Sequence, residues 1–118
     1  MIFIYHNPMW SKSRKSVEIL KEEKVKFNII EYLKMSPSVD DLKSLTKKLD
    51  LKPIDIIRKK DKLFKELQID KINENKKILE IIAEHPKLLE RPIVVKEEQA
   101  IIARPPELIY DFIKVSNI

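Results

Sequence analysis

A short apolar run that leads directly into a helical pattern is the feature that most constrains this chain. Met1 to Tyr5 reads as a buried strand, and the residues from Ser11 to about Lys24 have the spacing of an amphipathic helix. The loop His6-Asn7-Pro8-Met9-Trp10 joins them. A strand that runs into a helix leaves backbone N–H groups and the positive end of the helix dipole at the junction. Because such a junction favours anions, we expect a functional site there.

The segment after this helix predicts a second strand. Apolar and polar residues alternate from Val25 to about Tyr32, which is typical of a strand. A strand, a helical crossover and another strand favour a parallel pair. We expect Ser11 or Ser13 to cap the helix between them.

Residues 36–90 are predicted to be helical throughout and to form an insertion within one domain that spans residues 1–118. Ser38 and Asp41 have the spacing of a capping box. Pro53 suits the first turn of a short helix that carries Arg58. A later helix is expected to end at His85, before Pro86.

The last part of the chain predicts a hairpin and a helix. Residues 92–95 and 100–103 are brief strands around the polar turn 96–99. Pro105 is expected to start the final helix. Its predicted buried residues are Leu108, Ile109, Phe112 and Ile113. The order predicts an α/β fold with a mixed four-stranded sheet and flanking helices.

Composition excludes several classes of function. The formal charge of +5 comes from interleaved acids and bases, which indicates a solvated surface and makes nucleic acid an unlikely partner. No apolar run is long enough to cross a bilayer, so we expect a cytoplasmic protein with no membrane partner. The absence of Cys excludes disulfides, thiolate metal sites and redox relays. Because Gly is also absent, we expect positive φ at residues such as Asn73 or Asn75.

Three arginines are candidate anion-binding residues. Arg91 precedes the third predicted strand and Arg104 follows the fourth, so the hairpin would place both at its open end. Arg58 lies in the helical segment. Guanidinium groups bind tetrahedral oxyanions through paired N–H donors. The alternative is that each arginine pairs with a surface carboxylate.

His6 and Trp10 flank the loop where chemistry is expected. His6 either serves a site at the junction or orients the loop through hydrogen bonds. Trp10 is neither a nucleophile nor a base, because indole offers only an N–H donor. It could line a pocket, fill it or anchor a partner, and we expect packing, since large aromatic side chains are usually buried.

Taken together, these residues resemble the glutaredoxin-coupled arsenate reductase (ArsC) family, and the likeness runs nearly end to end. The matching stretches are Tyr5-His6-Asn7-Pro8, Ser13-Arg14, Arg58, His85-Pro86, Arg91-Pro92-Ile93-Val94-Val95, Ala103-Arg104-Pro105 and Glu107. The resemblance implies a thioredoxin-like fold with a helical insertion and a cis peptide at Arg91–Pro92. It also implies that Arg58, Arg91 and Arg104 hold an oxyanion such as arsenate, phosphate or sulfate. We place Ser13, Arg14 and His6 in the same predicted site.

The departure from the family falls at Trp10, where the resemblance puts the catalytic cysteine. The family reaction needs a thiolate that attacks arsenic, followed by reduction through glutathione and glutaredoxin, so we expect neither of these cofactors to act here. We therefore predict an ArsC-family protein without thiol-dependent arsenate reduction that retains oxyanion binding, with no catalytic residue and no metal. One alternative is a protein-interaction module like the Spx-type regulators that bind the RNA polymerase α subunit. Another is that only the family name, arsenate reductase, transfers.

Overall fold

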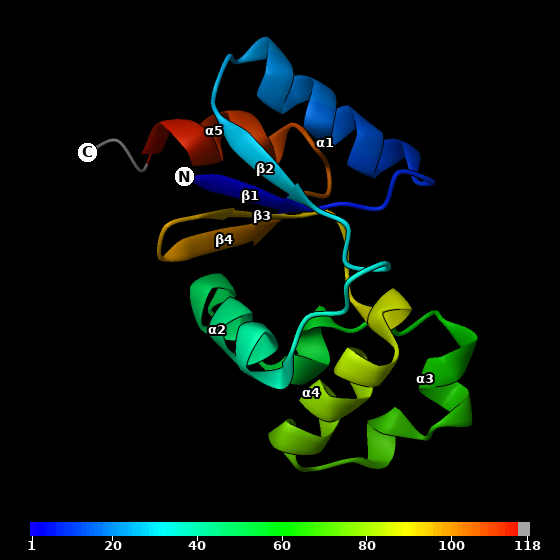
Figure 1. The fold of residues 1–118 in the computed structure, drawn as a ribbon. Coiled ribbons are helices and arrows are strands. Elements are labelled where there is room, and N and C mark those ends of the chain that lie inside the picture. The colour runs from blue at the N-terminus through cyan, green and yellow to red at the C-terminus, as the bar shows by residue number, and fades with distance from the viewer. Residues whose placement is uncertain (116–118) are drawn as a thin grey trace. The chain divides into compact units, whose positions relative to one another are not determined.

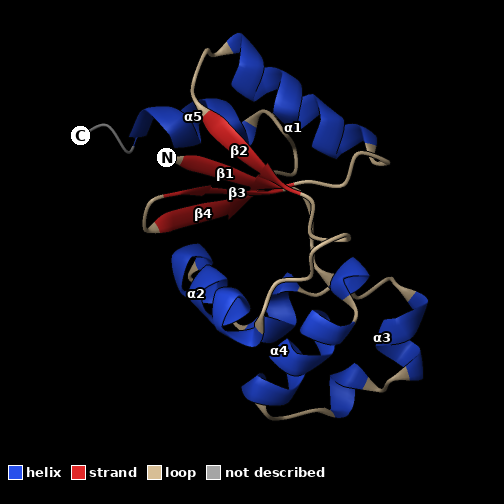
Figure 2. Cartoon of the chain, in the orientation of Figure 1, coloured by secondary structure: helices blue, strands red, loops and turns tan. Residues whose placement is uncertain are grey.

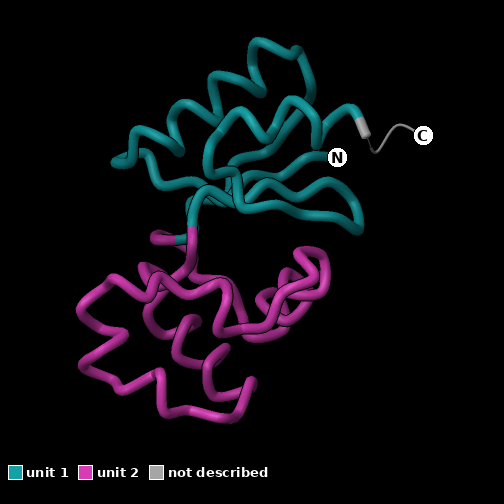
Figure 3. Tube along the Cα trace, turned by 180° about the vertical axis from the view of Figure 1, so that it is seen from behind, with its two compact units in different colours: residues 1–32, 91–118 teal, residues 33–90 magenta. Residues whose placement is uncertain are grey.

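The computed structural model describes residues 1–115, which form two compact units (Figure 3). Unit 1 contains residues 1–32 and the segment from residue 91 onward, and unit 2 contains residues 33–90. Unit 2 nearly coincides with the predicted helical insertion. In the described part of the chain, no helix is long and apolar enough to cross a membrane.

Unit 1 is built on a mixed four-stranded sheet with the strand order β2-β1-β3-β4 (Figure 1). Its strands are β1 (Ile2–Tyr5), β2 (Phe27–Ile30), β3 (Ile93–Lys96) and β4 (Gln99–Ile102). The predicted parallel β1–β2 pair and the predicted β3–β4 hairpin are both confirmed. β1 and β3 pair antiparallel, with Tyr5 opposite Ile93, so the ends of three strands meet beside the loop that follows β1.

Two helices cover one face of this sheet, α1 (Ser11–Glu22) and α5 (Leu108–Val115) (Figure 2). The buried core combines side chains of the sheet with the inward faces of both helices. Its members are Ile2, Ile4, Val17, Ile19, Leu20, Val94, Ala103, Ile109 and Ile113. Burial of this apolar surface is the main stabilising contribution to unit 1.

Two details of these helices differ from the prediction. Trp10, not a serine, is the N-cap residue of α1, and its side chain makes no capping hydrogen bond. Ser11 is the first helical residue, and the hydroxyl of Ser13 turns back to the preceding loop. Helix α5 starts at Leu108 rather than Pro105, and Leu108 is 46% exposed, so its predicted burial was wrong.

Apart from one isolated β-bridge, the regular elements of unit 2 are helices. Its elements are α2 (Val39–Leu49), η1 (Pro53–Ile56), α3 (Lys62–Glu66), η2 (Ile69–Lys71), α4 (Asn75–Glu84) and η3 (Pro86–Leu88), where η marks a 3₁₀ helix. The capping box at Ser38 and Asp41 is present, and His85 ends α4 as predicted. Arg58 lies beyond η1, because the chain turns extended at Ile57, which bridges to Leu89.

The left-handed backbone positions are not the predicted asparagines. Positive φ angles occur at Lys24, Asp50, Gln68 and Glu97. Lys24, Asp50 and Gln68 follow helices, and Glu97 lies in the hairpin turn; both settings commonly need a left-handed residue. Asn75 instead begins α4. The peptide bond Arg91–Pro92 is cis, as the resemblance implied, and Arg104–Pro105 is also cis.

Candidate functional site

The loop between β1 and α1 is held by its own hydrogen bonds. Asn7 organises it: its carbonyl accepts from Trp10 N at 3.1 Å, and its Oδ1 accepts from Met9 N at 3.0 Å. Arg14 Nη1 donates to the carbonyl of Pro8 at 3.0 Å. His6 N donates to the carbonyl of Ile30 at 2.9 Å, which fixes the start of the loop against β2. The loop is thus tied both to the sheet and to the first turns of α1.

A buried network joins His6, Ser13 and Asn7. Ser13 is fully buried and His6 is 8% exposed. The Ser13 hydroxyl accepts from Asn7 N at 3.0 Å and lies 2.5 Å from His6 Nδ1. Because the Ser13 oxygen accepts from Asn7, its hydrogen can point to Nδ1, an arrangement that suits the neutral imidazole.

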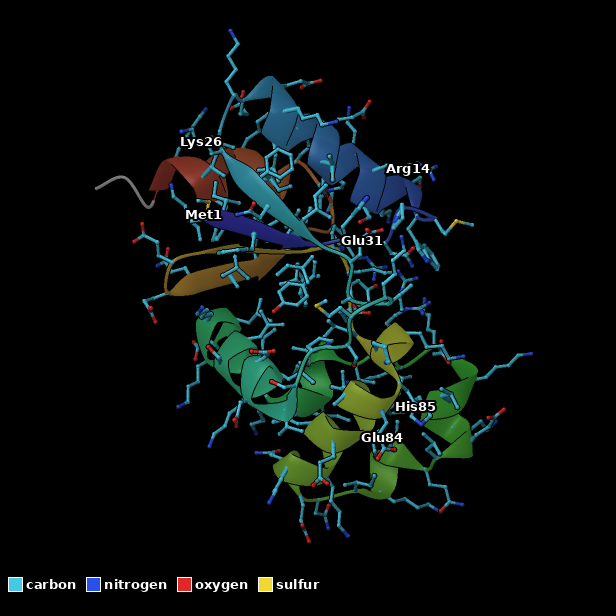
Figure 4. The ribbon with its side chains drawn as sticks, viewed as in Figure 1. Met1, Arg14, Lys26, Glu31, Glu84 and His85 are labelled. Atoms are coloured by element: carbon cyan, nitrogen blue, oxygen red, sulfur yellow. The ribbon has the colours of Figure 1, made fainter. Side chains whose placement is uncertain are left out.

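The electrostatic surroundings of His6 also favour its neutral imidazole. Burial lowers the pKa of His6 from its ordinary value of 6.5, Glu31 opposes this shift, and Arg14 adds to it. Figure 4 shows Arg14 near the start of α1 and Glu31 just after β2. Although Ser13 and His6 resemble a nucleophile and its base, substrate cannot reach a serine oxygen that is fully buried. These hydrogen bonds suit the alternative in which His6 orients the loop, and the role of His6 and Ser13 in binding an oxyanion stays a prediction.

Trp10 stacks on Arg91. The guanidinium carbon of Arg91 lies 3.5 Å from the centroid of the indole ring, a cation–π contact. Arg91 is only 6% exposed, whereas Trp10 is 46% exposed. The indole therefore packs on the guanidinium, as expected, but it is less buried than large aromatic side chains usually are.

Arg91 and Arg104 flank the hairpin as predicted but differ in exposure. Ile93 lies opposite Ile102, and Ala103 N donates to the carbonyl of Pro92 at 2.9 Å, so the two arginines adjoin the open end of the hairpin. Of the three arginines of unit 1 that the sequence placed in the site, Arg91 is buried, whereas Arg14 and Arg104 are exposed.

Arg58 belongs to unit 2 and has a different environment. Its Nη1 contacts Asp61 Oδ2 at 3.3 Å and donates to the carbonyl of Lys87 at 3.2 Å. Its backbone N donates to the carbonyl of Leu88 at 2.7 Å. For this arginine, the alternative of pairing with a carboxylate describes the observed contact, and its convergence with Arg91 and Arg104 stays a prediction.

Sequence reasoning missed two residues that shape these sites. Asp61 accepts from Leu63 N at 3.0 Å, which caps α3, and Lys87 Nζ lies 3.7 Å from the same Oδ1. Asn7 forms the turn before α1. The signal was available in both cases, because Asp and Asn in turns and before helices commonly accept from backbone N–H groups two residues on.

Residues 1–115 contain no cluster of three or more His, Cys, Asp or Glu side chains that could hold a metal ion. What unit 1 does offer is a buried guanidinium beside a solvent-facing indole. Such a group suits recognition of an anion, and no cysteine lies at the start of α1.

Comparison with known proteins identifies the family. Residues 5–112 match the model of the ArsC family. An arsenate reductase of Neisseria meningitidis is 42% identical over 108 residues, which cover 90% of this chain and 92% of that protein. The structure is similar to a putative arsenate reductase from Yersinia pestis, with a TM-score of 0.90, 37% identity and coverage of 94% and 99% of the two chains. An arsenate reductase from Vibrio cholerae gives a TM-score of 0.89 at 41% identity, covering 93% and 95%. The thioredoxin-like fold expected from the sequence is that of these structures, and the chain belongs to the ArsC family.

Proposed function

We propose that this protein binds a tetrahedral oxyanion such as arsenate, phosphate or sulfate without reducing it through a protein thiolate. The observation that carries the proposal is the position of Arg91. Its side chain is buried, its guanidinium stacks on Trp10, and it adjoins the loop in which relatives named arsenate reductase are expected to hold their cysteine. Stacking uses the face of the guanidinium, whereas its N–H donors lie in its plane, so stacking and anion binding are geometrically compatible.

The loss of reduction follows from the chemistry of the family reaction. Reduction of arsenate by that route needs a thiolate that bonds to arsenic and passes on two electrons, and the chain has no cysteine. Trp10 supplies neither a nucleophile nor a base. Under this proposal, glutathione and glutaredoxin have no protein adduct to act on, and the protein binds its anion in the cytoplasm.

Titration of the purified protein with sodium arsenate, phosphate or sulfate tests anion binding. Because an anion that binds only the folded state stabilises it by mass action, we expect Tm to rise with anion concentration. Trp10 is the only tryptophan, so its fluorescence should change in the same range. Sodium chloride at equal ionic strength is the control. A Tm and a fluorescence signal that respond no more to the oxyanions than to chloride would reject the proposal.

An arsenate reduction assay with glutathione and glutaredoxin tests the loss of chemistry. We expect no turnover by the native protein and measurable, slow turnover by Trp10→Cys. Trp10→Ser is the matched control, since it opens the same space without supplying a thiol. Turnover by the native protein would overturn the mechanism.

One observation favours a second candidate function, a protein-interaction module. Met9 is 82% exposed and Trp10 is 46% exposed, so the loop presents adjacent apolar side chains to solvent. Under this alternative, Trp10 anchors a protein such as the RNA polymerase α subunit. A pull-down with that subunit should then succeed with the native protein and fail with Trp10→Ala. Lack of enrichment by the native protein would dismiss this candidate.

A further inference from the structure

A groove of about 680 Å³ runs along the solvent side of α1, within unit 1. One wall is α1, and the other includes the residues immediately before α5. The residues that line it are His6, Ser11, Lys12, Arg14, Lys15, Val17, Glu18, Lys21, Pro106 and Glu107. Only part of this groove belongs to the loop described above; most of it follows the length of the helix.

The charge of the groove is predominantly positive. Lys12, Arg14, Lys15 and Lys21 line it, against the carboxylates of Glu18 and Glu107. Lys15 Nζ and Glu18 Oε2 are 4.0 Å apart with side chains 49% and 65% exposed. An ion pair that exposed contributes little, so it leaves most of the positive potential in place. The first turn of α1 also contains no acidic residue, although acids are the residues that stabilise a helix at that end.

The cations extend along the groove. Its lining on α1 includes lysines from Lys12 to Lys21, which are nine residues apart. Nine residues of helix rise roughly 13 Å, a distance that about four residues of an extended peptide span. The dimensions fit a short chain laid along the helix better than a single small anion.

We propose that this groove is a docking surface for an acidic segment of a partner protein. Charge complementarity carries the proposal: carboxylates of the segment would face Lys12, Lys15 and Lys21. Glu18 and Glu107 would accept an occasional basic side chain, which a protein segment can supply and a phosphate backbone cannot. The proposal rests on lysines outside the predicted oxyanion site and does not depend on oxyanion binding.

Fluorescence anisotropy with a labelled Asp/Glu-rich peptide of about ten residues that contains one lysine tests this surface. The test variant is Lys15→Glu combined with Lys21→Glu. The matched control is Lys76→Glu combined with Lys77→Glu, which makes the same change in net charge at exposed positions near the start of α4, where acids favour the helix. We expect the test variant to weaken binding about tenfold or more and the control to change it less than about threefold.

Each outcome decides the proposal. Saturable, salt-sensitive binding by the native protein that only the groove variant loses supports it, with circular dichroism confirming that both variants fold. Absence of binding by the native protein, equal losses in both variants, or tighter binding of a single-stranded DNA oligonucleotide than of the peptide would overturn it. Titration of the groove variant with phosphate separates the two proposals, because its oxyanion response should remain that of the native protein.

Discussion

Two arginines that the sequence places in one predicted site have unlike surroundings. Arg91, in unit 1, is 6% exposed and stacks on the ring of Trp10 at 3.5 Å. Arg58, in unit 2, contacts the carboxylate of Asp61 at 3.3 Å and the carbonyl of Lys87 at 3.2 Å. The first contact engages the face of a guanidinium, and the second engages its N–H donors.

This difference predicts unequal roles in anion binding. The guanidinium of Arg91 is buried, and a charge-assisted hydrogen bond to an anion is stronger where water is excluded. A guanidinium that already donates to a carboxylate and a carbonyl must exchange at least one of these bonds to bind an anion. We therefore expect Arg91 to dominate oxyanion affinity and Arg58 to stabilise unit 2.

The largest expected effect is on anion affinity. Arg91→Met removes a charge-assisted hydrogen-bond donor and should reduce phosphate or arsenate affinity by about 1.5–3 kcal/mol. Arg58→Met should reduce it by less than about 1 kcal/mol, because the native side chain must give up existing bonds to contribute. Isothermal titration calorimetry measures both. Lys26→Met, at an exposed position, controls for the loss of one positive charge. Equal losses of oxyanion affinity in the two arginine variants would show that their different surroundings do not give them different roles.

The next effect is on stability and concerns Asp61. Asp61→Ala removes the cap of α3 and the partner of Arg58, so the free energy of unfolding should fall by about 1–2 kcal/mol. Urea denaturation measures this loss. Asp70→Ala, an exposed aspartate of η2, is the control and should change the free energy of unfolding by less than about 0.5 kcal/mol. An Asp61 variant as stable as the native protein would show that this network does not stabilise unit 2.

The fold was more predictable than the contacts of these arginines. Alternation in Val25–Tyr32, the capping box at Ser38 and the strands around residues 96–99 are local patterns, and the elements that they predict are present. Such patterns report backbone conformation and burial, which depend on near neighbours in sequence. The parallel crossover and the hairpin accounted for the β1–β2 and β3–β4 pairs, whereas the antiparallel β1–β3 pair that joins them was not predicted.

The stacking of Trp10 on Arg91 could not be found in this way. The two residues are far apart in the sequence, and no local pattern couples an indole to a guanidinium. The predicted cap of α1 was wrong for a related reason. Ser13 has a suitable side chain, but its hydroxyl contacts His6 and Asn7, and the tertiary structure determines which of its potential partners a hydroxyl meets. The cap of α3 by Asp61, in contrast, has a local signature that closer attention to Asx motifs would have found.

The smallest expected effect is on the pH dependence of the free energy of unfolding. It concerns the surroundings of Arg91 rather than those of Arg58. The loop that carries Trp10 depends on a network with a titratable member, because burial lowers the pKa of His6 below 6.5. A histidine whose pKa is lower in the folded state binds fewer protons there than in the unfolded chain, so folding stability rises with pH. Its contribution is fully present above the unfolded value of about 6.5 and is lost as pH falls through the folded value. We therefore expect the free energy of unfolding of the native protein to decrease between about pH 7 and pH 5.

The variant His6→Gln isolates this contribution, because it removes the titration and keeps a hydrogen-bonding side chain. Its free energy of unfolding should fall less between the same two pH values than that of the native protein. Histidine titration by NMR gives the pKa of His6 directly. Since protonation places a second hydrogen between Nδ1 and the Ser13 hydroxyl, Trp10 fluorescence should change with the same midpoint in the native protein and not in His6→Gln. A His6 that titrates at or above 6.5, with an unchanged Trp10 signal, would show that the buried network does not control the loop and that the positions of Trp10 and Arg91 are independent of it.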